Sequence, residues 1–303
     1  TGLIDPTAAV AALRRRDNSI IACLTFFTGH PVTAYHPERQ IVFGEWPQVA
    51  CEKLSRELGG IPVGFVQGCA GDVNSKHMLE GSVEKSRRFG EYLGSAFIIA
   101  ANSLRPSKRT GFEWQRVPVD IPMGPLPPLA SLEKDLAELD DFMRRGNAGD
   151  ENTLSCVGMN FPHALSPPFR ARTAGAVRPW YVWAIAQHRA GIAGEVMKAL
   201  PLKIVVARFG DVGFVGLPWE PFVATGLKIK REAALPHVLT AGYTDGQNGY
   251  IPDASGTEDR EYMSGNYRYS SQRLPNGGWP PYKAPAGDAA AIIAVEILAK
   301  MAD

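Results

Sequence analysis

The sequence predicts an α/β protein in which mixed sheets are flanked by helices. In the first third of the chain, a strand-like run, a polar corner and a helix are followed by a second strand-like run, a glycine-rich corner and a second helix. This alternation favours an α/β fold with both corners on the same edge of the sheet. The last third again combines strand-like runs with helices, and neither a repeat nor a linker interrupts the chain. We therefore expect residues 1–303 to form a single domain.

The composition is typical of a globular protein, with 45% hydrophobic and 21% charged residues. The formal net charge of +1 gives no basic surface of the kind that binds nucleic acid. No apolar run reaches the length of a membrane-spanning helix. The cysteines are scattered without close pairs, so their spacing predicts neither a disulfide framework nor a cysteine metal site. They are Cys23, Cys51, Cys69 and Cys156.

The first strand-like run covers residues 20–27 and leads to a histidine. Its aromatic and β-branched residues predict a buried strand. The strand stops at Gly29, and Pro31 restricts the residue before it to an extended backbone. His30 therefore stands on a stiff corner at the end of a core strand, where α/β folds place their chemistry.

A helix, a second strand and a longer helix follow. Pro47 in the first turn and Gly59-Gly60 at the end delimit a helix over residues 47–58. Residues 61–66 form the second predicted strand, which ends in the corner Gly68-Cys69-Ala70-Gly71-Asp72-Val73-Asn74. The apolar residues of 82–104 share one face and predict the longer helix.

The middle of the chain predicts secondary structure and offers no candidate site residue. Residues 112–123 alternate apolar and polar side chains, which indicates a half-exposed strand. A charged amphipathic helix is expected over 131–145, followed by a loop-like stretch over 146–178. Residues 179–200 are expected to form a helix that packs in the core.

The last third returns to strands that end in polar residues. Residues 203–209 and 212–217 form two strands joined by a turn at Gly210-Asp211. The second of these strands leads to Glu220, with a helix beyond it. A further strand over 237–243 leads into a glycine-bearing loop that holds Tyr250, and an alanine-rich helix over 287–301 closes the chain.

Four strand ends thus carry polar residues: His30, Asp72 with Asn74, Glu220, and Tyr250. Glu220 follows an apolar strand, and a carboxylate buried there needs a partner or a metal because burying it alone is costly. Imidazole, carboxylate and further oxygen donors suit zinc, which keeps one position open for water in catalytic sites. The alternative interpretation is that Glu220 pairs with an arginine and His30 caps its strand.

These strand ends resemble motifs of the neutral, non-lysosomal ceramidases and their bacterial relatives. The corresponding segments are Gly29-His30-Pro31, Gly71-Asp72-Val73-Asn74, Leu217-Pro218-Trp219-Glu220 and Gly249-Tyr250-Ile251-Pro252. They occur in the same order as in that family, and the resemblance covers nearly the whole chain. It implies the α/β catalytic domain of a ceramidase, without its N-terminal segment.

The resemblance also implies roles for individual residues. His30 would be a zinc-binding histidine, Glu220 the carboxylate ligand and Tyr250 the phenolic ligand. Tyr262 falls where the family has a tyrosine that hydrogen-bonds the substrate carbonyl. Asp72 would orient a ligand histidine through its free ring nitrogen, or would cap the turn that follows it.

Three positions depart from the family pattern. Asn74 stands where the family has a serine in the substrate pocket, and Ser75 follows it. The family's Tyr-Glu pair is Tyr262-Met263 here, and Trp219 replaces a glycine before the ligand glutamate. These differences affect the specificity for a lipid amide and leave the expected metal ligands in place.

The largest departure is an absence. The family takes another zinc histidine, a catalytic histidine and a carbonyl-binding arginine from a segment upstream of the His-Pro strand. Residues 1–20 supply none of these histidines. The resemblance therefore implies a second polypeptide that carries the N-terminal half, with both chains cut from one precursor and Thr1 created by the cleavage.

The sequence accordingly predicts a zinc-dependent hydrolase of amide bonds whose site is shared with an N-terminal subunit. Two alternatives remain open at this stage. An N-terminal threonine can be a nucleophile with its own amine as base, which would make Thr1 the centre of a self-processing amidohydrolase. The chain can also be a binding domain without catalytic activity.

Overall fold

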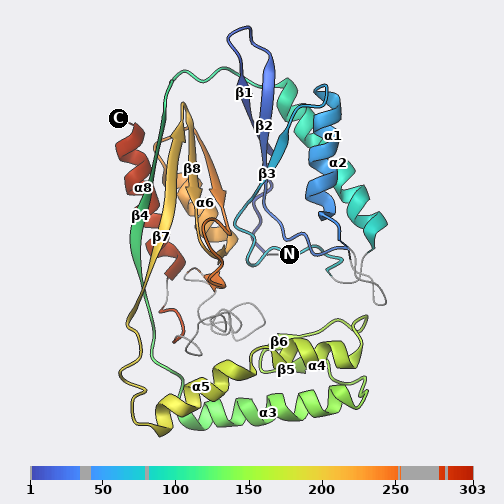
Figure 1. The fold of residues 1–303 in the computed structure, drawn as a ribbon, viewed down its shortest axis with the longest axis vertical. Helices are drawn as coiled ribbons and strands as arrows, with labels where there is room; N and C mark the ends of the chain where they lie inside the picture. The colour runs from blue at the N-terminus through green and yellow to red at the C-terminus, as the bar shows by residue number, and fades with distance from the viewer. Residues whose placement is uncertain are drawn as a thin grey trace.

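The computed structural model describes residues 2–34, 42–78, 82–251, 253, 280–283 and 286–302 (Figure 1). It contains two main sheets, each with helices on one face, and a helical layer at one end of the molecule. The predicted α/β class with mixed sheets flanked by helices is therefore confirmed.

The first sheet has three strands in the order β1-β2-β3, with α1 and α2 packed on one face. Strand β2 runs antiparallel to β1 and parallel to β3. Parallel strands end at the same sheet edge, so the prediction that the two polar corners share an edge is confirmed. The bounds are β1 Ala9–Arg14, β2 Ile20–Phe27, β3 Val63–Gln67, α1 Glu45–Glu57 and α2 Val83–Asn102.

The second sheet has four strands in the order β10-β8-β7-β4, and α6 and α8 cover one face of it. The turn at Gly210 and Asp211 joins β7 to β8 as predicted, and Gly210 has a positive φ of 57° that favours glycine. The bounds are β4 Phe112–Pro122, β7 Ala199–Phe209, β8 Val212–Gly216, β10 His237–Ala241, α6 Val223–Glu232 and α8 Ala286–Ala302.

The helical layer corrects two expectations. The stretch 146–178 is not a loop, because it contains α4 and the small hairpin of β5 and β6. The helix expected over 179–200 ends at Arg189, where Gly191 adopts a φ of 75°, and β7 has already begun at Ala199. The bounds are α3 Leu129–Asn147, β5 Ser155–Cys156, β6 Met159–Asn160, α4 Pro167–Gly175 and α5 Arg178–Arg189.

The two main sheets meet at the carboxyl ends of β3 and β10. Gly68 and Ala241 form an antiparallel bridge, and Gly242 N donates to Gln67 O at 3.0 Å. The short strands β9 (Glu220–Pro221) and β11 (Tyr250–Ile251) pair in parallel close to this junction. We call the junction of β3 with β10 the seam. It brings the polar ends of strands from both sheets into one region.

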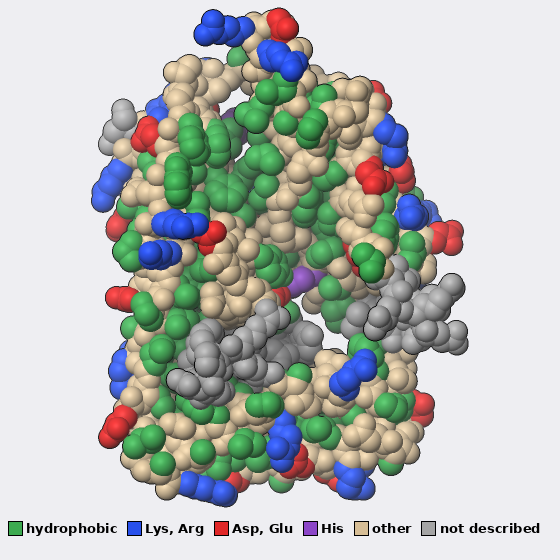
Figure 2. Space-filling view, in the orientation of Figure 1, with side chains coloured by type: hydrophobic (Ala, Val, Ile, Leu, Met, Phe, Trp, Pro, Cys, Tyr) green, Lys and Arg blue, Asp and Glu red, His purple; other side chains and the backbone are tan. Residues whose placement is uncertain are grey.

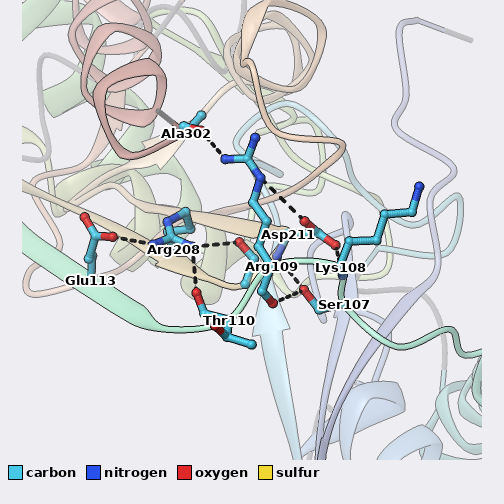
Figure 3. Close-up of polar contacts among 9 residues, drawn as sticks. Ser107, Lys108, Arg109, Thr110, Glu113, Arg208, Asp211 and Ala302 are labelled. Atoms are coloured by element: carbon cyan, nitrogen blue, oxygen red, sulfur yellow. Dashed lines mark hydrogen bonds and ion pairs between the residues drawn. The ribbon is translucent and has the colours of Figure 1, made fainter.

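A polar cluster at the opposite end of the second sheet holds the connection between α2 and β4 (Figure 3). Arg208 donates to the carbonyls of Thr110 and Gly210 and contacts Glu113. Arg109 reaches the carbonyl of Ala302 at the end of α8 and pairs with Asp211 at 3.8 Å. The cluster thereby fixes the last helix and the β7–β8 turn to the start of β4.

Buried hydrophobic residues gather in three clusters, one with each main sheet and one in the helical layer. The single domain over residues 1–303 stays a prediction. Within the residues that the structure describes, no helix has both the length and the apolar character needed to cross a membrane.

Candidate active site

His30 and Glu220 meet at the seam although 190 residues separate them in the chain. His30 Nε2 lies 3.0 Å from Glu220 Oε2, and the two side chains are only 11% and 10% exposed. Among the described residues, Glu220 therefore pairs with a histidine and not with an arginine.

Both residues are positioned by backbone contacts between neighbouring strand ends. The His30 N–H donates to the Val73 carbonyl at 2.9 Å, and Gln67 Nε2 donates to the Gly29 carbonyl at 3.0 Å. On the other side, the Glu220 N–H donates to the Gly249 carbonyl at 2.8 Å. These hydrogen bonds fix the backbone positions of His30 and Glu220.

A glycine permits this close approach of the two sheets. Gly71 N donates to the Pro221 carbonyl at 2.9 Å. A Cβ atom on Gly71 would lie 2.5 Å from the carbonyl oxygen of Glu220, which is too close for any side chain. Glycine at this position lets the corner after β3 lie directly against β9.

Tyr243 is a site residue that the sequence analysis missed. Its hydroxyl lies 2.9 Å from His30 Nε2 and 3.0 Å from Glu220 Oε2. The sequence places Tyr243 inside a strand over 237–243, but β10 ends at Ala241 and Tyr243 has a φ of 56°. A left-handed backbone at a residue other than glycine is strained and is found preferentially at functional sites. The signal in the sequence is Gly242, which directly follows the buried run and marks the strand end.

Gln247 is the second residue that was missed, and it contacts the other carboxylate oxygen. Gln247 Nε2 donates to Glu220 Oε1 at 2.6 Å. Burial opposes ionisation of Glu220, but the interactions with His30, Tyr243 and Gln247 outweigh it and hold the pKa of the carboxyl below its usual value. Burial and the adjacent Glu220 carboxylate raise the pKa of Tyr243, so its phenol stays protonated and donates.

The other predicted residues lie around this centre or outside the described chain. Tyr250 pairs with Glu220 across β9 and β11, and its ring centroid lies 6.3 Å from that of His30. Asp72 Oδ1 accepts from Val223 N at 2.7 Å, which caps the first turn of α6. Asn74 is exposed in the same corner. Thr1 and Tyr262 lie outside the described residues.

The donor set partly fits a zinc ion. An imidazole nitrogen, a carboxylate oxygen and the Tyr243 phenol oxygen converge, and the first two are types of group that bind zinc in proteins. Within the described chain, no group of three or more His, Cys, Asp or Glu side chains is placed to hold a metal. His30 and Glu220 thus provide two of the side-chain types that bind zinc in proteins.

Comparisons with known proteins match the fold of the chain to solved structures. No protein-family model and no curated protein sequence matches the chain. The crystal structure of neutral ceramidase from Pseudomonas aeruginosa matches 99% of this chain, with a TM-score of 0.60 and 14% identity. A ceramidase complexed with C2 matches 98% of it, with a TM-score of 0.57 and 15% identity.

The chain has the fold of part of a neutral ceramidase. The resemblance seen in the sequence motifs is therefore confirmed for the fold. The matched region is 47% of one ceramidase chain and 48% of the other, so this chain spans less than half of their length.

Proposed function

We propose that the chain is part of a zinc-dependent hydrolase that cleaves an amide bond. The observation that carries the proposal is the contact of His30 Nε2, Glu220 Oε2 and the Tyr243 hydroxyl at the seam of a ceramidase-like fold. A buried carboxylate whose pKa is shifted by a specific neighbouring group is typical of functional sites, and the pKa of Glu220 is lowered in this way.

Several individual residues have a proposed part in this reaction. His30 and Glu220 hold the zinc, with Tyr250 as the phenolic ligand, and Gln247 orients the carboxylate. When bound, zinc supplies an activated water and Lewis acidity toward the carbonyl. Tyr262 donates a hydrogen bond to the developing oxyanion, a contribution of about 2.7 to 4 kcal/mol by analogy with other such donors.

Two further residues complete the proposed site around this centre. Asp72 orients a ligand histidine, in addition to its bond with Val223 N. Asn74 lies in the same corner and contacts the substrate.

We further propose that a second polypeptide, an N-terminal fragment of the same precursor, completes the site. His30 Nδ1 is buried and has no hydrogen-bond partner among the described residues. A zinc-bound histidine normally donates its other ring N–H to an acceptor. An acceptor for Nδ1 and additional zinc ligands, including further histidines, would come from this fragment.

The sheet faces opposite the packed helices support the proposal of the same partner. Leu13 and Leu24 lie on the face of the first sheet that α1 and α2 do not cover, and they are 56% and 41% exposed. Trp114, on the uncovered face of the second sheet, is 54% exposed. Hydrophobic side chains gather on the surface between the two sheets (Figure 2). Large exposed apolar patches mark interaction surfaces, so a large apolar partner fits here.

Hydrolysis of an amide panel tests the function. We expect zinc-dependent turnover of at least one N-acyl amide, and Tyr262→Phe should lower the turnover number about 100- to 1,000-fold without changing the zinc content. Turnover would be measured by release of the free amine, and zinc by elemental analysis. Equal turnover of the two proteins would remove Tyr262 from the mechanism, and no turnover of any amide, ester or lactam would favour a binding domain.

The mass of the native assembly tests the partner. Denaturing mass spectrometry of the protein purified from its natural source should show this chain together with a second polypeptide. The chain expressed alone is the control and should bind zinc more weakly. A lone 32.8 kDa species that binds zinc tightly and hydrolyses amides would contradict the shared site and return Thr1 to consideration as a nucleophile.

A further inference from the structure

Glu45, at the start of α1, is a buried carboxylate with no part in the predicted chemistry. It is 7% exposed, and its Oε1 accepts a hydrogen bond from the Ala34 N–H. Its other oxygen, Oε2, accepts from the Ser86 hydroxyl at 2.9 Å, and Ser86 on α2 is itself fully buried. The carboxylate thus joins the loop that follows His30 to a helix of the first sheet.

The backbone of Glu45 is strained. Its φ of 58° lies in the left-handed region that favours glycine, and α1 nevertheless carries a glutamate there. Such a conformation costs on the order of 1 to 3 kcal/mol and persists only where surrounding contacts hold it in place. The two hydrogen bonds of the carboxylate are those contacts, so the side chain has a reason to be at this position that glycine would not satisfy.

The loop that Glu45 holds begins at His30, only four residues before Ala34. At its start, the His30 N–H bonds to the Val73 carbonyl at 2.9 Å. Within it, the Val32 N–H bonds to the His30 carbonyl at 3.0 Å. At its end, the Glu45 carboxylate holds Ala34. The loop is therefore fixed at both ends, with the imidazole at the first end.

The neighbouring residue on α1 contacts the same corner through its ring. Trp46 packs edge-on against Phe27, with ring centroids 5.7 Å apart, and a Cβ on Gly29 would lie 3.8 Å from the Trp46 ring. The start of α1 is thus in contact with the corner on both sides of His30.

We infer that Glu45 is a positioning residue for His30: its carboxylate fixes the loop from His30 to Ala34 against α1 and α2 and so sets where the imidazole points. The part of this inference that concerns zinc depends on the proposed function. The part that concerns the loop does not.

Hydrogen exchange of backbone amides, with Glu45→Gly and Glu45→Gln compared with the wild type, tests the loop. Glycine accepts the backbone conformation but lacks the carboxylate, so the amides of Ala34 and His30 should exchange at least about tenfold faster. Glutamine can accept from the Ala34 N–H and donate to the Ser86 oxygen, and should restore slow exchange at both amides. A role confined to α1 would change exchange at Ala34 and leave His30 as in the wild type.

Zinc affinity, measured by competition with a chromophoric chelator, tests the consequence for the metal. The Glu45→Gly protein should bind zinc about tenfold more weakly, at the lower end of the effect of removing groups that support metal ligands. A wild type that binds no zinc would refute the proposed function and leave the exchange result standing.

Unchanged exchange at His30 in Glu45→Gly would overturn the inference. If Glu45→Gly fails to fold, Ser86→Ala is the alternative test, because it removes one of the two hydrogen bonds that orient the Glu45 carboxylate. Faster exchange at the His30 amide in Ser86→Ala would support the positioning role, and wild-type exchange there would overturn it.

Discussion

Replacement of Glu220 with alanine is expected to abolish both zinc binding and amide hydrolysis. The carboxylate is buried, lies against His30 and accepts hydrogen bonds from Tyr243 and Gln247, so alanine removes the proposed carboxylate ligand from a built site. The His30→Ala protein should lose the same two properties, because it removes the imidazole from the same contact. Zinc content by elemental analysis and amine release by chromatography would be measured on the same samples.

A matched control variant distinguishes the loss of a zinc ligand from the loss of a carboxylate far from the site. Glu113 is a glutamate at the opposite end of the second sheet, where it contacts Arg208. The Glu113→Ala protein should keep its zinc and its activity. Full activity of Glu220→Ala, or of the wild type after complete removal of metal, would refute the proposed zinc site.

Replacement of Trp219 with alanine is expected to reduce the free energy of unfolding by about 3 to 5 kcal/mol. The indole is fully buried in the core of the second sheet, and its Nε1 donates to the Tyr282 hydroxyl at 3.1 Å. Tyr282 in turn donates to the Asn248 carbonyl at 2.9 Å, in the loop that supplies Gln247. Loss of the ring therefore removes packing and also support for the site loop.

Trp219→Phe is an intermediate case. Phenylalanine keeps part of the packing but loses the second ring and the N–H, so its cost should be smaller than that of the alanine variant. Both variants would be compared with the wild type by urea denaturation. Equal midpoints for the alanine variant and the wild type would show that the indole contributes no packing energy. The same position also explains a departure from the ceramidase pattern, because the structure uses the ring as a core residue.

Much of the fold could be predicted from local patterns, and the errors have physical causes. Helix α4 was missed because Pro167 and Pro168 suggest a loop, although proline is favoured in the first turn of a helix. The predicted helix over 179–200 is too long because the apolar pattern continues past Gly191 into β7. In both cases one or two residues at an element boundary decided the outcome.

The site could be predicted only in part. His30 and Glu220 were found because each follows a buried strand, and the parallel pairing of β2 with β3 follows from the alternation of elements. The seam between the sheets is formed by one bridge, Gly68 with Ala241, which no local pattern reveals. The contact of Tyr243 with His30 depends on that long-range geometry, and the contacts of Gln247 and Glu45 depend on loop and helix packing, so their roles became visible only in the structure.

The seam determines when the two parts of the site come together during synthesis of the chain. Domains fold progressively as the chain leaves the ribosome, and contacts between distant residues form last. His30 belongs to the first sheet, which is synthesised early. Glu220 is synthesised 190 residues later. Under the proposed function, a nascent or truncated chain that has formed only its first sheet is inert. Under the same proposal, hydrolytic activity requires that the second sheet has docked against the first, in addition to the N-terminal fragment.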